Sequence, residues 1–332
     1  MSSDKKEKSR LDIARETWND FLLFLYNKDE GTVLGRNGNS WSKILVFYMF
    51  YYGFLACLFA ASISIVLSTL SDYTPKYQTR LQTPGVAIQP KTPSDIEQTS
   101  NIKYNLKNYQ DNAGYQRLTL QMEKFLYPYA TVNQTNNEVF QDCIMTQPPS
   151  TNQNFEKDQI AKSCRFDITK LGPCSVKPYG YDKGQPCIFV KVNRIIGWYP
   201  VGYTNLSRAV GNSQSDAPPL SDVLATYGQS YQPYLMYTHC YGDEQEDKDK
   251  LGGTLDTKYF PTHMGIPFVY FPYAGKKRQP GYINPIVAVQ FTNVTKNVDI
   301  TIKCKVYALN IRDNKEMGEG YFKFDMRIDD KE

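Results

Sequence analysis

Histidine is scarce in this sequence, with only His239 and His263 among 332 residues. A Ser-His catalytic triad needs one of these rings beside a positioned nucleophile, and no Gly-x-Ser-x-Gly elbow is present. The sequence also lacks a Gly-x-x-x-x-Gly-Lys-Ser/Thr loop for nucleotide phosphates and a Cys-x-x-Cys pair for zinc. These absences predict a chain that is not an enzyme and that has no catalytic residue, metal site or cofactor.

A strong excess of one charge is also missing, because 38 Lys and Arg residues are balanced by 34 Asp and Glu residues, for a net charge of +4. A surface that binds phosphate backbones needs a clear basic excess, so we expect no nucleic-acid partner. Aromatic residues are plentiful instead, with 26 Tyr and 17 Phe. Such residues suit strands, interfaces and membrane boundaries.

Charge is absent altogether from Ile44 to Ser71. A helix of that length would be roughly 40 Å long, which exceeds the ~30 Å hydrocarbon layer of a bilayer. Trp41 precedes the run, and Tyr73 and Tyr77 follow it, as residues of an aromatic belt do. A buried core helix rarely extends so far without a charged face, and a cleaved signal peptide would be shorter. We therefore predict a transmembrane signal-anchor helix over 44–71.

Cysteines and glycosylation motifs indicate the orientation of this span. Arg36 and Lys43 before it are matched by Lys76 and Arg80 after it, so the positive-inside rule does not decide. Cys57 lies in the span and the other six cysteines follow it, as expected for an oxidising compartment. The three Asn-x-Ser/Thr motifs also follow it, at Asn133, Asn205 and Asn293. We predict a single-pass type II protein with a cytoplasmic N-terminus and an extracellular C-terminus.

Four segments are predicted along the chain: a cytoplasmic tail over 1–43, the span over 44–71, an extended Pro-, Gln- and Asn-rich stalk with few strands over 72–115, and an extracellular domain over 116–332. Ser40 is placed to cap the spanning helix. In the tail, apolar residues recur at helical spacing, which fits either an amphipathic helix on the inner membrane surface or a segment that binds a partner. These residues are Leu11, Ala14, Trp18, Phe21, Leu22 and Leu25.

The extracellular domain is predicted to be a mainly-β antiparallel sandwich. Residues 298–307 and 322–328 alternate between apolar and polar side chains, so each strand should have one dry face. Further strand candidates are 188–192, 234–238, 266–271 and 286–291. Cys304 falls on a dry face, so we expect its disulfide to connect one layer to another. The six cysteines allow fifteen pairings, and spacing does not choose among them.

Two short motifs are typical of other single-pass proteins. Asp247-Lys248-Asp249 fits the Asp-x-Asp metal motif of glycosyltransferases, but no hydrophobic strand precedes it, so we expect a solvated loop. Trp18-Asn19-Asp20 fits the triplet near the calcium site of a lectin, but it lies on the wrong side of the span. The basic run 276–278 is expected to be an exposed turn.

The spanning helix has two faces suited to another membrane helix, because small residues permit close approach and Tyr hydroxyls can bond across the contact. At about 100° per residue, the small residues fall within about one third of the circumference. They are Gly53, Cys57, Ala60, Ala61, Ser64 and Ser68. A neighbouring stripe consists of Tyr48, Tyr52, Phe59 and Ile63.

The whole chain resembles the beta subunits of the Na,K-ATPase and its H,K-ATPase relatives. The resemblance lies in LGRNGNSWSKILVFYMFYYGFLA, PKYQTRLQTPG, CSVKPYGYDKGQPCIFVKVNRIIGW, YFPYAGKK, and PIVAVQFTNVT leading into TIKCKVYALNI. Two positions differ from the family pattern: Tyr51 stands where Phe is usual, and Ala274 replaces a usual Tyr.

The resemblance implies an immunoglobulin-like sandwich with sequential disulfides, Cys143–Cys164, Cys174–Cys187 and Cys240–Cys304. It implies an accessory subunit that helps a catalytic alpha subunit to fold, assemble and reach the plasma membrane, and that modulates its potassium affinity. Tyr48, Tyr51 and Tyr52 match ring positions at the seventh membrane helix of the alpha subunit. Its tenth membrane helix, its extracellular loops and a small single-span regulatory subunit are further implied partners. The matching extracellular segment contains Tyr270, Phe271, Pro272, Tyr273, Gly275 and Lys276.

Three alternatives stay open at this point. The chain could be an H,K-ATPase beta subunit, a glycosylated single-pass cell-adhesion protein, or a membrane-anchored transferase that uses Asp247.

Overall fold

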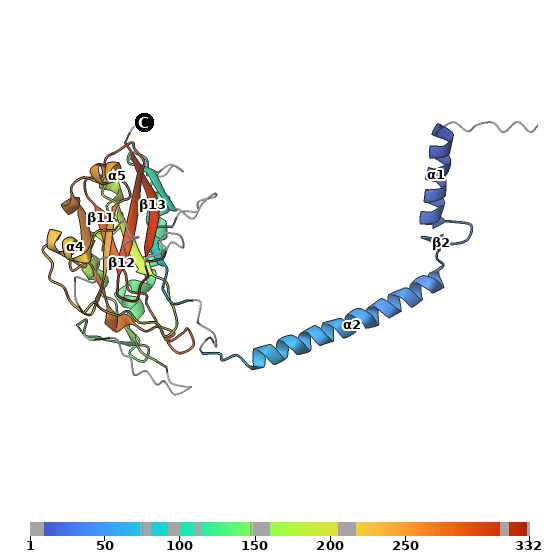
Figure 1. Cartoon of the computed structure of the whole chain (residues 1–332), viewed down its shortest axis with the longest axis horizontal. Coiled ribbons are helices and arrows are strands. Elements are labelled where there is room, and N and C mark those ends of the chain that lie inside the picture. The colour runs from blue at the N-terminus through green and yellow to red at the C-terminus, as the bar shows by residue number, and fades with distance from the viewer. Residues whose placement is uncertain are drawn as a thin grey trace, which may run out of the picture. The chain divides into compact units, whose positions relative to one another are not determined.

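The computed structural model describes residues 10–73, 75, 81–91, 100–109, 114–146, 148, 160–204, 217–312 and 319–330. The chain divides into two compact units, Met1–Ser71 and Asp72–Glu332. The first holds two helices and a short hairpin, and the second is mainly β with three disulfides (Figure 1). The predicted fold class is confirmed: one membrane-spanning helix and a disulfide-linked β domain, the name used below for the second unit.

The first unit contains α1 (Arg10–Leu25), β1 (Tyr26–Asn27), β2 (Thr32–Val33) and α2 (Gly38–Ser68). Among the described residues, α2 is the one helix long and apolar enough to cross a membrane. It starts before the charge-free run, because Trp41 and Lys43 belong to its first turns.

The cap of α2 differs from the prediction. Asn37 is the N-cap, and its side-chain oxygen accepts a hydrogen bond from the backbone N–H of Ser40 at 2.9 Å. Ser40 therefore lies in the first turn and receives the cap instead of providing it. The prediction for Ser40 was wrong because the helix continues upstream through Gly38 and Asn39.

Two sheets form most of the β domain. The five-stranded sheet has the order β10 (Gly265–Pro267), β8 (Leu235–Gly242), β12 (Ile300–Tyr307), β13 (Tyr321–Asp329), β4 (Ser100–Asn105). The four-stranded sheet has the order β3 (Val86–Gln89), β7 (Cys187–Val192), β11 (Val287–Phe291), β9 (Thr257–Phe260). Neighbouring strands run antiparallel except β13 and β4, which are parallel. A separate parallel pair joins β5 (Phe140–Gln141) to β6 (Ser163–Cys164).

Three short α-helices accompany the sheets: α3 (Gln116–Leu126), α4 (Leu220–Thr226) and α5 (Gln245–Lys250). Leu118, Met122 and Leu126 recur every four residues on α3 and are buried, so this helix packs by one apolar stripe. Short 3-10 segments also occur in the β domain, and the longest of them is kinked at Gly172. They are Tyr127–Tyr129, Thr131–Gln134, Ile168–Ser175, Tyr181–Lys183, Thr254–Asp256 and Phe268–Tyr270.

One hydrophobic core contains residues from both sheets, including Val190 and Val289 from one and Ile302 and Phe324 from the other. The alternation predicted for β13 is confirmed, because Phe324, Met326 and Ile328 are buried and the residues between them are not. A single core between two sheets is the arrangement of a sandwich.

The range expected to be an extended stalk with few strands contains β3 and β4, each of which hydrogen-bonds at the edge of a sheet. Two other details of the β domain differ from the predictions. The strand expected over 266–271 stops at Pro267 and continues as a 3-10 turn. The Cys240–Cys304 disulfide joins neighbouring strands of one sheet, because these residues face each other in the β8–β12 register. Cys304 is buried as predicted, but Lys303 and Lys305 on the expected wet face are buried too. The alternation also did not indicate which strand lay opposite.

Candidate partner-binding surfaces

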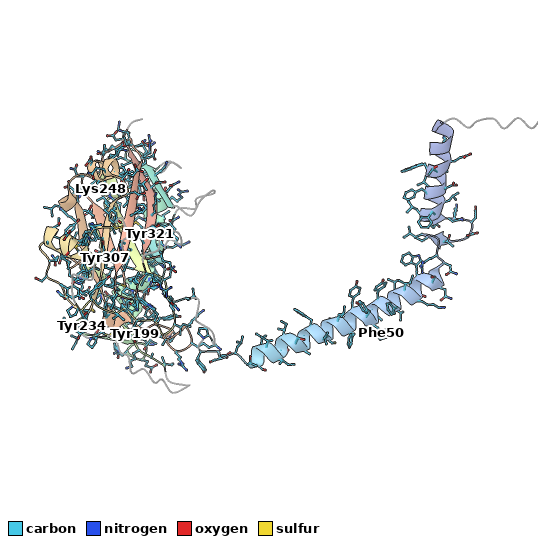
Figure 2. The ribbon with its side chains drawn as sticks, in the orientation of Figure 1. Phe50, Tyr199, Tyr234, Lys248, Tyr307 and Tyr321 are labelled. Atoms are coloured by element: carbon cyan, nitrogen blue, oxygen red, sulfur yellow. A yellow bond between two sulfur atoms is a disulfide. The ribbon has the colours of Figure 1, made fainter. Side chains whose placement is uncertain are left out.

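The side chains of α2 have no cover in the first unit, since none of its residues is buried. Phe50 is 69% exposed and projects from the helix (Figure 2). A helix that is apolar on all sides and buried on none is stable only where lipid or another protein surrounds it. The faces of α2 are therefore the first candidate binding surface.

The three Tyr residues of the span form a cluster of rings. Tyr48 and Tyr52 lie one turn apart and stack with centroids 5.8 Å apart, and Tyr51 meets Tyr52 edge-on at 5.4 Å. Phe47 stacks on Tyr51 at 6.1 Å. The cluster is a broad, relatively rigid aromatic surface, because each ring restricts the rotamers of the next.

Small residues lie on another side of α2. A Cβ atom built on Gly53 would meet nothing within 4 Å, so the structure itself gives no packing reason for glycine there. Cys57, one turn further, is exposed and unpaired. Residues of this size are typical of closely packed membrane helices.

The extracellular segment 270–276, in contrast, is largely packed into the β domain. Tyr270 and Phe271 are buried, and the Tyr270 hydroxyl donates to the carbonyl of Arg165 at 3.0 Å. Burial raises the pKa of Tyr270, so the hydroxyl stays protonated and remains a donor. Phe271 meets the Trp198 ring edge-on at 5.6 Å. These two residues anchor the segment in the core of the β domain, so their rings are not on the surface that a partner could contact.

Only part of this segment is exposed. Pro272 and Tyr273 are half-buried and Lys276 is exposed, whereas Gly275 is buried. The Tyr273 ring lies 4.7 Å from that of Tyr282, and the Arg194 guanidinium lies over both rings at 5.5 and 5.2 Å. Tyr273 and Lys276 are thus the residues best placed to contact another protein.

Three contacts that the sequence did not predict attach this loop to the first residues of the β domain. Lys277 Nζ lies 2.6 Å from Asp72 Oδ2, and the Arg278 guanidinium lies 5.1 Å from the centre of the Tyr73 ring. The ion pair lowers the pKa of Asp72 and raises the pKa of Lys277. Gly275 has a φ of +98°, and a Cβ there would lie 3.1 Å from the Tyr73 carbonyl, so glycine permits this approach. We call these contacts the exit clasp.

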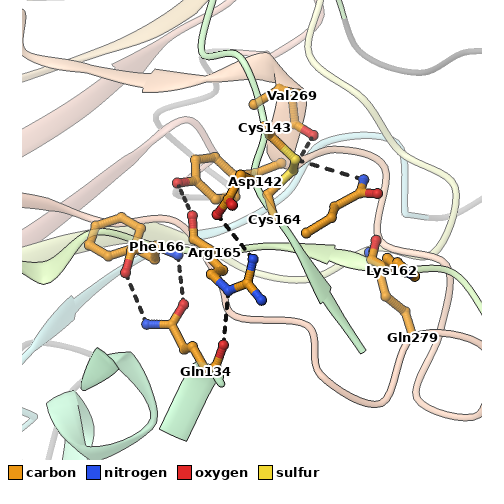
Figure 3. The surroundings of a disulfide bond; sticks show 11 residues. Gln134, Asp142, Cys143, Lys162, Cys164, Arg165, Phe166, Val269 and Gln279 are labelled. Atoms are coloured by element: carbon orange, nitrogen blue, oxygen red, sulfur yellow. Dashed lines mark hydrogen bonds and ion pairs between the residues drawn. A yellow bond between two sulfur atoms is a disulfide. The ribbon is translucent and has the colours of Figure 1, made fainter. Parts of the chain in front are cut away.

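Three disulfides hold the β domain: Cys143–Cys164, Cys174–Cys187 and Cys240–Cys304, the pairing that the resemblance implies. The first lies beside the segment discussed above, because Cys164 Sγ is 3.6 Å from the Val269 carbonyl (Figure 3). Next to it, Arg165 donates to Asp142 at 3.0 Å and to the Gln134 carbonyl at 2.9 Å. This network fixes the turn from which the 270–276 segment extends.

The predicted glycosylation sites differ in exposure. Asn293 is exposed, whereas Asn133 is half-buried and its side-chain nitrogen donates to the Tyr127 carbonyl at 2.6 Å. Asn205 lies outside the described residues. Of the two described motifs, Asn293 is the more accessible to an oligosaccharide.

The residues considered for chemistry have structural contacts. His239 is buried and its Nδ1 lies 3.0 Å from the Tyr259 hydroxyl. Asp247 and Asp249 lie in α5 rather than in a loop, and the loop prediction was wrong for this reason. Asp247 closes a capping box with Glu244 and accepts from the backbone N–H of Thr301 at 3.2 Å. Among the described residues, no cluster of His, Cys, Asp or Glu could hold a metal ion.

Comparison with known proteins covers nearly the whole chain. Residues 12–324 match the family model described as the sodium/potassium ATPase beta chain. The chain is 34% identical over 332 residues to the human sodium/potassium-transporting ATPase subunit beta-2, with 98% of each chain covered. It is 33% identical over 330 residues to subunit beta-1 of Tetronarce californica, covering 96% of this chain and 100% of the relative.

Proposed function

The chain belongs to the sodium/potassium ATPase beta chain family, and from this premise we propose that it is the non-catalytic subunit of a plasma-membrane sodium and potassium pump. Its partner would be the catalytic alpha subunit. In this proposal residues 1–43 are cytoplasmic and the β domain is extracellular. The six disulfide-bonded cysteines, all on one side of the span, support that orientation.

The observation that best supports the proposal is that no residue of α2 is buried in the structure. The Tyr cluster of α2 would pack against the seventh membrane helix of the alpha subunit. The side of α2 that contains Gly53 and Cys57 would allow close approach of the tenth membrane helix or of a small regulatory subunit. Polar groups of a multi-span pump are costly when they face lipid. A helix with Tyr hydroxyls and small residues can satisfy such groups, which would assist folding, assembly and delivery to the cell surface.

Outside the membrane, the exposed part of the 270–276 segment would contact the extracellular loops of the alpha subunit. Tyr273 and Lys276 are the accessible members, and Arg194 holds the Tyr273 ring in place. Within the β domain, the exit clasp holds Lys277 and Arg278 against Asp72 and Tyr73, which favours a fixed position for this loop.

A bound beta subunit would also modulate potassium affinity if it bound one conformation of the pump more tightly than another. The change in affinity equals the difference between the two binding free energies. A difference of about 1 kcal/mol would change the apparent potassium affinity about fivefold.

The test is co-expression of an alpha subunit with the Tyr48→Leu, Tyr52→Leu double variant. We expect less co-purified alpha subunit and a shifted potassium activation curve, because the variant loses two rings and two hydroxyls from one side of α2. The matched control is Phe54→Leu, which removes a ring that points to a different side of α2 and lies outside the Tyr cluster. Normal assembly and unchanged potassium activation in the Tyr variant would refute the proposed contact.

The relatives named above carry the sodium/potassium name, which favours a sodium pump over the H,K-ATPase alternative. Measuring which ion the assembled complex exports distinguishes the two.

A further inference from the structure

Helix α1 has an exposed apolar face that nothing in the first unit covers. Trp18, Phe21, Leu22 and Leu25 are 61, 48, 46 and 37% exposed. At about 100° per residue they lie within about 100° of the helix circumference. Glu16 and Asp20 lie on the opposite side, and Arg15 and Asn19 lie between the two sides. Leu23 and Phe24 are also exposed but lie outside this apolar face, so the separation of apolar from polar residues is partial. The Trp18 and Phe21 rings are 5.9 Å apart on the apolar face.

The hairpin between the helices holds the end of α1 beside the beginning of α2. The backbone N–H of Leu34 donates to the Leu25 carbonyl at 3.1 Å. The indole N–H of Trp41, in the first turns of α2, donates to the Val33 carbonyl at 2.8 Å. Together these bonds connect the last residue of α1 to the first turns of the spanning helix.

Glycine is required for this connection. Gly35 has a φ of +71°, and a Cβ there would lie 3.3 Å from the Phe24 ring. A side chain at this position would disfavour the backbone conformation and press against α1. Gly35 and the two hydrogen bonds thus hold the end of α1 next to the first turns of α2.

Trp41 indicates where the first turns of α2 lie in a bilayer. Trp residues at the ends of membrane spans lie among the lipid headgroups, with the ring partly in the apolar layer. A helix held there by these two hydrogen bonds would have lipid next to its apolar face. Its exposed charged residues Arg15, Glu16 and Asp20 carry both signs, so attraction to an anionic surface is not needed for binding.

We propose that α1 is an interfacial helix that lies in the membrane leaflet on the N-terminal side of the span. Trp18, Phe21, Leu22 and Leu25 enter the boundary between headgroups and acyl chains, and the lipid bound is zwitterionic phosphatidylcholine. The proposal requires α2 to cross a membrane but does not require a pump partner.

The test uses the full chain, without any alpha subunit, in nanodiscs of phosphatidylcholine. Cys57, the free cysteine of the described residues, is changed to Ser, and a nitroxide is attached at Leu22→Cys or at Asp20→Cys. These two positions point to nearly opposite sides of α1. Accessibility to oxygen and to a water-soluble nickel complex then gives the depth of each label.

We expect the label at residue 22 to lie about 5–10 Å below the headgroup boundary and the label at residue 20 to stay in water. Phe21→Cys is a second apolar position, in case the change at Leu22 weakens the helix. Equal access of the nickel complex to all three labels would overturn the proposal. So would spin–spin broadening between labels, which would mean that a second copy covers the face, or burial that appears only after an alpha subunit is added.

Discussion

The spanning helix and the β domain differ in the exposure of their aromatic residues and in the state of their cysteines. Phe50 on α2 is 69% exposed, whereas Phe324 on β13 is fully buried between two sheets. Cysteine shows the same contrast, because Cys57 on α2 is free and all six cysteines of the β domain are paired. The β domain buries its apolar side chains within its own core, whereas the apolar side chains of α2 need lipid or another protein to cover them.

Because of this difference, the residues that stabilise the β domain are not the residues of α1 and α2 that would bind lipid or a partner. Three disulfides and one continuous core stabilise the β domain without a partner. The faces of α2 and α1 contribute nothing to that core, so substitutions there should alter binding to lipid or protein and leave the β domain folded. The predictions below test this separation, beginning with the largest expected effect.

The first prediction compares cysteines of the two regions. Replacing Cys240 and Cys304 together by Ala should lower the free energy of unfolding of the β domain by about 4 kcal/mol, because their sequence separation of 64 makes the closed loop the longest of the three. The measurement is denaturant unfolding of the full chain in detergent, followed by near-ultraviolet circular dichroism. Cys57→Ala is the control and should leave the midpoint unchanged. Equal loss of stability in both variants would break the contrast between the regions.

The second prediction concerns a titratable group inside the β domain. Burial lowers the pKa of His239 to about 4, below the value of about 6.5 in an unfolded chain. Between these values the unfolded state binds a proton that the folded state does not, so the stabilisation present above pH 6.5 is lost as the pH falls toward 4. The full difference corresponds to roughly 3 kcal/mol.

His239→Gln should flatten this part of the pH dependence, because Gln can still bond the Tyr259 hydroxyl but does not titrate. The measurement is the unfolding midpoint of the full chain between pH 7 and pH 4. His263→Gln serves as the control and should retain the fall that His239 causes. If His239→Gln shows the wild-type slope, another group is responsible for acid sensitivity.

Long, regular patterns in the sequence predicted much of this fold. Alternation identified β12 and β13, and the charge-free run identified α2. Short strands were harder: β3 has four residues and lies within a Pro- and Gln-rich segment, so its composition suggested a stalk. Its burial depends on pairing with β7, which lies about a hundred positions away and leaves no local signal.

The candidate surfaces were predictable to a similar degree. Helical spacing indicated both faces of α2, since that pattern depends only on neighbouring residues. The resemblance pointed to 270–276, but Tyr270 and Phe271 proved to be core residues. The exit clasp could not be foreseen, because Asp72 and Lys277 are separated by 205 positions and each alone resembles an ordinary exposed charge.

The smallest effect is expected at the exit clasp, which involves the first residues of the β domain. Asp72→Asn removes the ion pair with Lys277, and since both side chains are exposed the unfolding midpoint of the β domain should not change. Amide hydrogen exchange should instead become faster in peptides that contain residues 72–73 and 275–278. Because the pKa of Asp72 is lowered and that of Lys277 is raised, the wild type should show the same loosening in acid, as Asp72 is protonated.

The matched control is Glu123→Gln, which removes an exposed ion pair of similar geometry with Lys177, far along the sequence from the clasp. Exchange at residues 72–73 should stay unchanged in that variant. If Asp72→Asn also leaves it unchanged, the contact of Arg278 with the Tyr73 ring and the close approach at Gly275 are sufficient to hold the chain there. The loop at 270–278 would then be attached to the chain after α2 by packing, and acid would not release it.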